Sequence, residues 1–270
     1  MRGLVRACHP EPALAVTILM IALALAAGRG AGTVWVGLAI LAGQLSVGWS
    51  NDWIDRTRDR QVGRRDKPIV AGQVSDRAVG LAALIAAAAC VPLSFVSGVW
   101  AGIAHLTGVA FAWGYNVGLK ATALSVVPYA VAFGLLPAVI TLGRPGAPFA
   151  PWWAVAGGAL LGAGAHFTNT LGDLDDDLAT GVRGLPHRLG RRATLVAAAA
   201  LLAGSVVALA LGPPGSRGAG AIGALSIALL CVAGVIIAGL RGAPRVGWRL
   251  TLVTAVVAVG LLVMRGASLV

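Results

Sequence analysis

The stretch Asn51-Asp52-Trp53-Ile54-Asp55-Arg56-Thr57-Arg58-Asp59 repeats an oxygen-bearing side chain at every fourth position: Asn51, Asp55 and Asp59. On an α-helix, residues four apart share one face and lie about 6 Å apart along the axis. The same Asn-x-x-x-Asp-x-x-x-Asp spacing returns at Asn169, Asp173 and Asp177. Each of these two sets of three residues, called a frame below, lies where a long apolar run ends. We therefore expect two polar clusters, at the ends of two membrane helices.

The composition is that of a polytopic membrane protein. Of 270 residues, 58% are hydrophobic and 11% are charged, whereas a soluble domain carries about 25% charged residues. We predict an all-α integral membrane protein, with residues 1–270 forming a single transmembrane domain. Runs of about 20 apolar residues are long enough to cross a bilayer. Nine such runs are present, at 13–28, 33–50, 78–96, 99–117, 124–142, 151–171, 193–211, 219–239 and 248–264.

The basic residues predict the orientation of these nine transmembrane helices. With the N-terminus in the cytoplasm, 17 of the 21 Lys and Arg residues fall on the cytoplasmic side, as the positive-inside rule requires. The exceptions are Arg29, Arg144, Arg217 and Arg265. Both acidic clusters then face the cytoplasm from the cell membrane. Residues 1–28 also resemble a signal peptide, but the alternation works best if this segment remains as the first span.

The formal net charge of +11 does not indicate a nucleic-acid partner, because most basic residues lie in short gaps between apolar runs. The two frames suggest an internal repeat instead. One frame closes the second predicted span and the other closes the sixth. Two four-helix halves plus one further helix in one bundle would place the clusters opposite each other, and repeats of this kind are common in membrane proteins.

The acidic residues concentrate in these clusters. Of ten Asp and Glu residues, Glu11 is the one that lies neither in nor shortly after a frame. Carboxylates facing each other at a membrane edge repel one another, and a multivalent cation removes this repulsion. Several carboxylate and amide oxygens suit Mg²⁺, which usually shares its site with substrate phosphates. The clusters therefore predict a metal-bridged phosphate group at the cytoplasmic interface.

Basic residues that follow each cluster are candidates for holding that phosphate, although a role as ordinary juxtamembrane charges is about equally compatible with each. They include Arg64 and Lys67 after the first frame, and Arg183 after the second. A phosphate whose remainder lies among apolar helices belongs to a lipid. Ionisation of an isoprenyl diphosphate is the economical reaction, since metal ions neutralise the leaving diphosphate and an apolar pocket shelters the carbocation.

These motifs resemble the signatures of the UbiA superfamily of intramembrane prenyltransferases. The first frame, followed by Lys67-Pro68-Ile69-x-Ala71-Gly72, is similar to the first family signature. Asn169-x-x-x-Asp173-x-x-Asp176-Asp177-x-x-x-Gly181 is similar to the second, and Tyr115-Asn116-x-x-Leu119-Lys120 to a third element. The resemblance covers nearly the whole chain. The segment after Gly181 departs from the usual form, and Lys67 stands where the family usually has Arg.

The resemblance implies an Mg²⁺-dependent transfer of a prenyl group from an isoprenyl diphosphate donor to an aromatic or other lipophilic acceptor. It also implies roles for individual residues. Asp55, Asp59, Asp173, Asp177, Tyr115 and Lys120 would be catalytic. Asn51, Asn169, Arg64, Lys67 and Arg183 would bind the diphosphate. The metal ligands would be Asn51, Asp52, Asp55, Asp59, Asn169, Asp173, Asp176 and Asp177.

Two other functions remain open from the sequence. A terpene cyclase of the same fold would ionise the diphosphate without an acceptor, and a divalent-cation transporter would use the acids as a transport site. The predicted spans carry no acid near their middles, which speaks against transport. His166 lies one helical turn before Asn169 and is either an acceptor contact or a packing residue. Residues 61–75 form either a cap over the site or a plain connecting loop.

Overall fold

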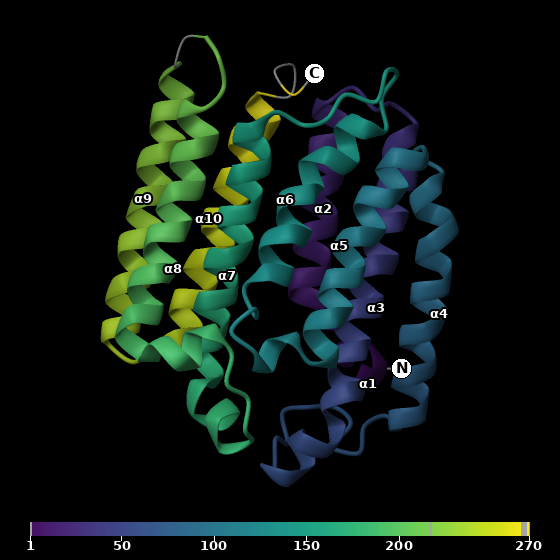
Figure 1. Ribbon diagram of the computed structural model, residues 1–270, viewed down its shortest axis with the longest axis vertical. Coiled ribbons are helices and arrows are strands. Elements are labelled where there is room, and N and C mark those ends of the chain that lie inside the picture. The colour runs from purple at the N-terminus through teal and green to yellow at the C-terminus, as the bar shows by residue number, and fades with distance from the viewer. Residues whose placement is uncertain (1, 216–217, 266–268, 270) are drawn as a thin grey trace.

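The computed structural model describes residues 2–215, 218–265 and 269, which contain helices and turns and no strand. The chain begins with a short helix that precedes nine long ones (Figure 1). The elements are α1 (Arg2–Ala7), α2 (Pro10–Ala26), α3 (Gly32–Gln61), α4 (Asp76–Phe95), α5 (Val99–Val117), the 3₁₀ turn η1 (Leu119–Ala121), α6 (Val127–Leu142), α7 (Trp152–Ala179), α8 (Leu185–Leu211), α9 (Ala219–Leu240) and α10 (Pro244–Met264).

Each of the nine predicted apolar runs overlaps one of the helices α2 to α10. Among the described helices, α3, α4, α8, α9 and α10 are long and apolar enough to cross a membrane by length and composition. The helices α2 and α6 are apolar but shorter. The all-helical fold is therefore confirmed, and five helices qualify as membrane spans. Nine crossings remain a prediction.

Two predicted boundaries differ from the structure in a way that matters for the site. The helix α3 continues to Gln61 and α7 continues to Ala179, well beyond the apolar runs at 33–50 and 151–171. Hydrophobicity ends before the backbone hydrogen bonding does, so both frames lie on the last turns of these helices, as their four-residue spacing predicts. The helix α8 begins at Leu185 and bends at Gly190, where φ is 78°.

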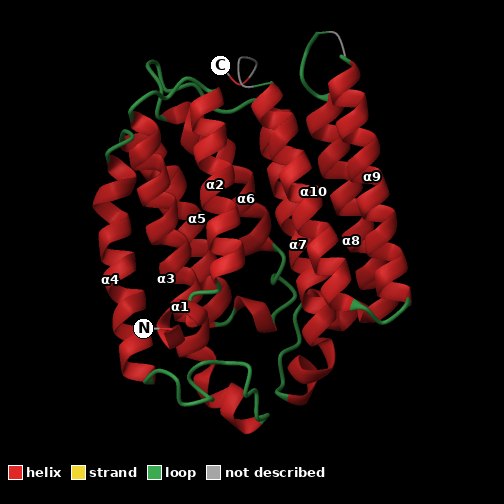
Figure 2. Cartoon of the chain, turned by 180° about the vertical axis from the view of Figure 1, so that it is seen from behind, coloured by secondary structure: helices red, strands yellow, loops and turns green. Residues whose placement is uncertain are grey.

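Six helices form a closed ring. In this ring α2 packs on α3, α3 on α5, α5 on α6, α6 on α7, α7 on α10, and α10 on α2. The helix α4 packs outside α3 and α5, and α8 and α9 pack outside α7 and α10 (Figures 1 and 2). The two frame-bearing helices α3 and α7 are both ring members. The second half of the chain contributes α10 to the ring rather than α9, so the two predicted four-helix halves are not used identically.

Small residues allow α6 and α7 to approach closely. A Cβ atom added at Gly158 would lie 2.5 Å from the backbone oxygen of Phe133 in α6, and one added at Gly134 would lie 3.1 Å from the side chain of Ala159 in α7. Such approaches are typical of helix packing in membranes. They draw α7, with its frame, against α6 at the wall of the ring.

The segments that follow α3, α5 and α7 all lie at one end of the bundle, together with the N-terminus (the lower end in Figure 1). At this end the 62–75 segment turns back and enters α4, whose first turn is capped by Ser75: its Oγ accepts a hydrogen bond from the amide of Ala78 at 3.2 Å. Because α3 and α7 both end here, their two polar frames come to the same end of the ring.

Candidate active site

The ring encloses a cavity of about 720 Å³ that extends to the end of the bundle where α3 and α7 end, and this end is called the mouth below. Both frames line it, and so do most of the side chains singled out in the sequence. These are Asn51, Asp52, Asp55, Asp59, Arg64, Lys67, Tyr115, Lys120, Asn169, Asp173 and Asp177. Farther from the frames, the walls are apolar and include Ile40, Val109, Leu136 and Val139. The cavity thus joins a charged mouth to an apolar interior.

Arg58 connects the two frames across the cavity. Its Nη2 lies 3.1 Å from Oδ2 of Asp55 on its own helix and 3.9 Å from Oδ1 of Asp177 on α7. One guanidinium nitrogen therefore holds two carboxylates that are more than a hundred residues apart in the sequence. Nε2 of His187 lies 3.2 Å from the other oxygen of Asp177. The predicted opposition of the clusters is present in the structure.

Lys120 reaches the first frame from the turn η1. Its ammonium forms a hydrogen-bonded ion pair with Oδ1 of Asp55. Burial lowers the pKa of Lys120, and the Asp55 carboxylate acts in the opposite direction. Asn116, at the end of α5, donates hydrogen bonds to Ser50 and to the backbone of Val47 in α3. These bonds fix the α5 terminus against α3, so the turn that follows it delivers Lys120 to Asp55.

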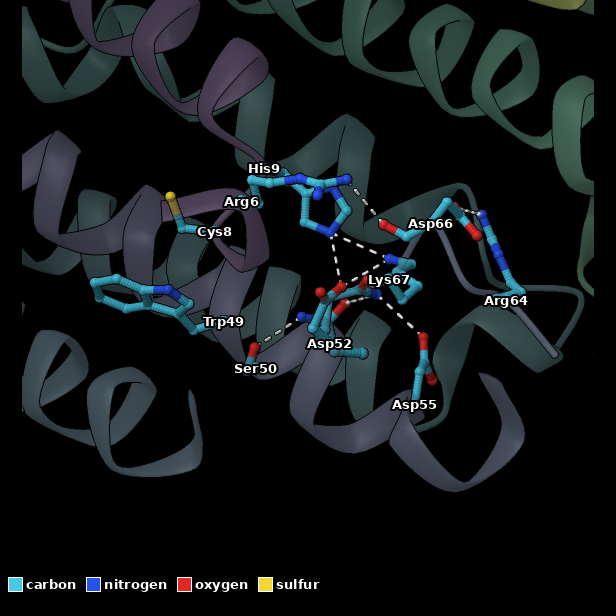
Figure 3. Close-up of polar contacts among 12 residues, drawn as sticks. Arg6, Cys8, His9, Trp49, Ser50, Asp52, Asp55, Arg64, Asp66 and Lys67 are labelled. Carbon is cyan, nitrogen blue, oxygen red and sulfur yellow. Dashed lines mark hydrogen bonds and ion pairs between the residues drawn. The ribbon is translucent and has the colours of Figure 1, made fainter. Parts of the chain in front are cut away.

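Asp52, which follows Asn51 directly, lines the cavity with the first frame but contacts basic side chains. Its side chain is 1% exposed and its Oδ1 accepts a hydrogen bond from Nζ of Lys67 at 2.7 Å; Nε2 of His9 lies 2.9 Å from the same oxygen (Figure 3). One residue along a helix turns the side chain by about 100° from that of Asn51, but Asp52 lies three residues before Asp55, so the two acids share a face of α3. The resemblance places Asp52 among the metal ligands; in the structure its Oδ1 pairs with two basic side chains, and its Oδ2 is buried without a hydrogen-bond partner among the described residues.

The 62–75 segment is tied to its surroundings on two sides. Arg6 of α1 donates to the side chain of Gln73 at 3.0 Å and to the backbone oxygen of Asp66 at 3.4 Å. Arg64 lies 3.2 Å from Asp66 and 3.7 Å from Asp173 on α7. Burial acts to lower the pKa of Arg64, but the carboxylates of Asp173 and Asp66 raise it above its usual value. The segment therefore spans the cavity mouth between α1 and α7, as a cap would.

Two predicted residues are not brought to the cavity. Asp176 is exposed on α7, and its backbone oxygen accepts a hydrogen bond from the hydroxyl of Thr180. Arg183 is exposed as well, and its backbone oxygen accepts a hydrogen bond from Nε of Arg188. Neither side chain lines the cavity. The segment that contributes to the wall there does so through Val182 and His187 instead.

The side chains at the mouth suit a hard cation by their chemistry. Four carboxylates and two carboxamides of the frames line one cavity, and oxygen donors of this kind fit Mg²⁺. Among the described residues, no three His, Cys, Asp or Glu side chains already converge on one point as a preformed cluster. The carboxylates are instead paired with Arg58, Arg64 and Lys120. The donor set fits the metal, while the pairing shows that cations already occupy positions around these carboxylates.

Aromatic side chains line the wall between the mouth and the apolar interior. The rings of Tyr115 and Tyr129 meet edge to face with centroids 5.2 Å apart, and Tyr129 stacks with Phe133 at 6.4 Å. His166 lies 4.9 Å from Tyr129 and 5.6 Å from Tyr115. The faces of aromatic rings attract cations and pack well against planar groups. This wall thus suits either a carbocation or an aromatic ligand.

Three residues of the site were missed in the sequence. The sequence places Arg58 only among the basic residues on the cytoplasmic side. Its position three residues after Asp55 could have indicated that it belongs to the site, because residues three apart share a helix face. His9 and His187 were not singled out. Both lie outside the repeated frames; His9 contacts Asp52, which is distant in the chain, and His187 contacts Asp177 across the turn between α7 and α8.

The family model of the UbiA prenyltransferase family matches residues 13–249. The chain belongs to this family. Two curated relatives are similar to it in sequence. The Bacteriochlorophyll synthase 33 kDa chain of Cereibacter sphaeroides is 32% identical over 190 residues, which are 63% of this chain and 58% of that protein. The Rhodobacter capsulatus protein of the same name is 31% identical over 182 residues, 59% and 56% of the two chains. The alignments thus span a little over half of each relative.

Solved structures of UbiA homologues share the fold over nearly the whole chain. A UbiA homolog from Archaeoglobus fulgidus bound to GPP and Mg²⁺ superposes with a TM-score of 0.72 at 17% identity, covering 99% of both chains. The same homolog bound to DMAPP and Mg²⁺ gives 0.71 at 18% identity, with 98% of both chains covered. A digeranylgeranylglyceryl phosphate synthase gives 0.66 at 14% identity and covers 98% of both. At these identities the likeness establishes the UbiA fold.

Proposed function

We propose that this UbiA family member transfers a prenyl group from an isoprenyl diphosphate to an aromatic or other lipophilic acceptor within the membrane, with release of diphosphate. One observation carries the proposal: the frames of α3 and α7 line the charged mouth of a cavity whose interior is apolar. A diphosphate matches the mouth and an isoprenoid chain matches the interior. The GPP and DMAPP bound to the Archaeoglobus fulgidus homolog support this choice of donor.

Mg²⁺ would be held by the amides and carboxylates of Asn51, Asp55, Asp59, Asn169, Asp173 and Asp177. When bound, it would neutralise the negative charge that develops on the departing diphosphate. The binding of Mg²⁺ in the same structures of the homolog supports the choice of metal. Asp176 is left out of this set because it lies outside the cavity. Asp52 is assigned to holding the 62–75 segment, because its partner Lys67 belongs to that segment.

The chain's own cations would bind the donor. Arg58, Arg64 and Lys120 line the mouth and already pair with carboxylates, so phosphate oxygens would find them in place and partly desolvated. The bond between C1 of the prenyl group and the diphosphate oxygen breaks, and its electron pair leaves with the diphosphate. A nucleophilic atom of the acceptor forms the new bond to C1 and loses a proton. The apolar walls exclude water from the cation.

We also propose that the nine long helices α2 to α10 all cross the cell membrane, with the N-terminus and the cavity mouth on the cytoplasmic side. Support comes from the distribution of basic residues in the sequence and from the position of α1, the 62–75 segment and η1 at one end of the bundle. Donor and acceptor would then reach the cavity as membrane-dissolved lipids. Labelling of single cysteines introduced at positions 65 and 147 from either side of sealed vesicles tests this orientation.

The experiment uses purified protein in nanodiscs with Mg²⁺ and isoprenyl diphosphates of several lengths, with and without pooled aromatic acceptors. Diphosphate release and mass spectrometry are the readouts. We expect acceptor-dependent release together with a prenylated product. Asp55→Asn should lower turnover about 100-fold or more. Asp76→Asn is the matched control, because Asp76 pairs with Arg56 and Arg60 away from the cavity.

Release without an acceptor that yields a cyclic hydrocarbon would assign a terpene cyclase instead. Mg²⁺ flux into proteoliposomes without diphosphate release would assign a transporter. Full turnover in Asp55→Asn would refute the metal and diphosphate assignment.

A further inference from the structure

His166 is a buried histidine of α7 that the proposed chemistry does not use. It is 1% exposed, lines the cavity, and precedes Asn169 by three residues, which is about 4.5 Å along the helix axis. We propose that His166 donates a hydrogen bond from Nδ1–H to an oxygen atom of a planar, oxygenated acceptor, an inference that rests on the proposed function. His166 would thereby select and orient the acceptor next to the prenyl C1 atom.

The hydrogen bonds around Ser125 determine which nitrogen of His166 carries the proton. Ser125 is fully buried; its Oγ accepts a hydrogen bond from the amide of Leu185 at 2.9 Å and lies 3.0 Å from Nε2 of His166. The Ser125 hydroxyl proton needs an acceptor, and among the described contacts Nε2 of His166 is the atom that can take it. Since a buried hydroxyl without an acceptor costs about 1–3 kcal/mol, Nε2 is the unprotonated nitrogen. In the neutral ring the proton then resides on Nδ1.

Nδ1 of His166 is itself buried and has no hydrogen-bond partner in the described part of the chain. Buried donors are nearly always paired in folded proteins, and an exception requires an explanation. His166 lines the cavity, so a small movement of the wall on ligand binding would bring Nδ1–H to a bound molecule, which then provides the missing acceptor. An oxygen with a lone pair satisfies Nδ1–H, whereas a hydrocarbon leaves it unpaired.

The neighbours of His166 indicate that this molecule is planar. The ring of Tyr129 lies 4.9 Å away at 33°, and the ring of Tyr115 lies 5.6 Å away at 85°. Phe133 extends this wall by stacking on Tyr129, and all four side chains line the cavity. Aromatic walls favour flat aromatic ligands by offset stacking and edge-to-face contact. The Nδ1–H group beside them would then donate a hydrogen bond to an oxygen on the ligand's edge.

The first test needs no ligand. Protein labelled with ¹⁵N in its histidine rings is studied in nanodiscs by long-range ¹H–¹⁵N correlation, and the signals of His166 are assigned by comparison with His166→Phe. We expect the neutral tautomer protonated at Nδ1. A neutral ring protonated at Nε2 would overturn the inference.

The second test uses two planar probes of similar outline, 2,3-dimethyl-1,4-naphthoquinone and 1,2,3,4-tetramethylnaphthalene. Only the first carries carbonyl oxygens. We expect it to bind about five- to tenfold more tightly, as one neutral hydrogen bond allows, and to shift the Nδ1–H proton resonance. Equal affinities, no binding of either probe, or an unmoved resonance would overturn the proposed role.

Two conservative variants separate recognition from packing. In His166→Asn the amide nitrogen takes the place of Nδ1, and in His166→Gln the amide takes the place of Nε2 beside Ser125. We expect the preference for the quinone to survive in His166→Asn and to disappear in His166→Gln. The reverse result would assign His166 a structural role through Ser125. Both tests are independent of turnover, so a failure of the proposed prenyl transfer would be recognised separately, by the absence of diphosphate release.

Discussion

Replacing Asp52 with Asn tests whether this acid holds the cap or the metal. The Asp52 side chain is 1% exposed, and its partners Lys67 and His9 are 12% and 41% exposed. Removing one partner of a buried ion pair costs about 3–5 kcal/mol because the other charge is left without compensation. His9 and Lys67 can still reach some solvent, so we expect the lower end, about 3 kcal/mol. For a chain of this size that corresponds to a fall in Tm of about 6–12 °C.

The assay is thermal unfolding of purified protein in detergent, followed by the loss of the monodisperse size-exclusion peak. Asp76→Asn serves as the control, because its side chain is 41% exposed and pairs with Arg56 and Arg60 at the surface. Surface ion pairs contribute about 0–1 kcal/mol, so this variant should shift Tm by about 4 °C at most. The Mg²⁺ concentration that gives half-maximal turnover is measured for both variants at the same temperature.

The reasoning predicts that Asp52→Asn unfolds earlier but keeps its Mg²⁺ dependence, since Asp52 is engaged by Lys67 and His9 and not by the frame of Asp55. The opposite pattern would refute it. If the variant unfolds like the wild type and needs far more Mg²⁺, Asp52 is a metal ligand and its pairing with Lys67 is secondary.

Two further predictions concern the mouth of the cavity and the packing of the bundle. Arg64→Gln should raise the KM for the isoprenyl diphosphate about tenfold or more by removing a charge-assisted contact. Arg183→Gln changes an exposed side chain outside the cavity, so its KM should stay within about twofold of the wild-type value. Steady-state diphosphate release measures both KM values, and equal effects would contradict the assignment. Gly158→Val should destabilise the protein by about 1–3 kcal/mol because its side chain would meet the backbone of α6, and Gly223→Val, where a Cβ meets nothing within 4 Å, should leave Tm near the wild-type value.

The sequence by itself determined the elements that depend on local chemistry. Nine apolar runs predict the helices α2 to α10, because burial in lipid demands continuous apolar stretches with internally satisfied backbones. The i, i+4 spacing places Asn51, Asp55 and Asp59 on one face, since helical periodicity is a property of the chain itself. Hydropathy alone could not find where α3 and α7 end, because polar residues continue the same helices past the apolar runs.

The tertiary structure alone decided which side chains complete the site. Arg58 meets Asp177 and Arg64 meets Asp173 because α3 and α7 end at the same end of a closed ring. The 62–75 segment brings Lys67 to Asp52, and both side chains line the cavity.

The physical reason for this division is the separation along the sequence of the residues that interact. Helix formation and side-chain facing follow from neighbours within a few residues, so a sequence displays them. Ion pairs between segments more than a hundred residues apart depend on how the helices pack. Close approaches such as that of Gly158 to Phe133 determine this packing. The two Asn-Asp-Asp frames could therefore be identified from the sequence, while the ion pairs through which Arg58 and Arg64 join them appear only in the folded chain.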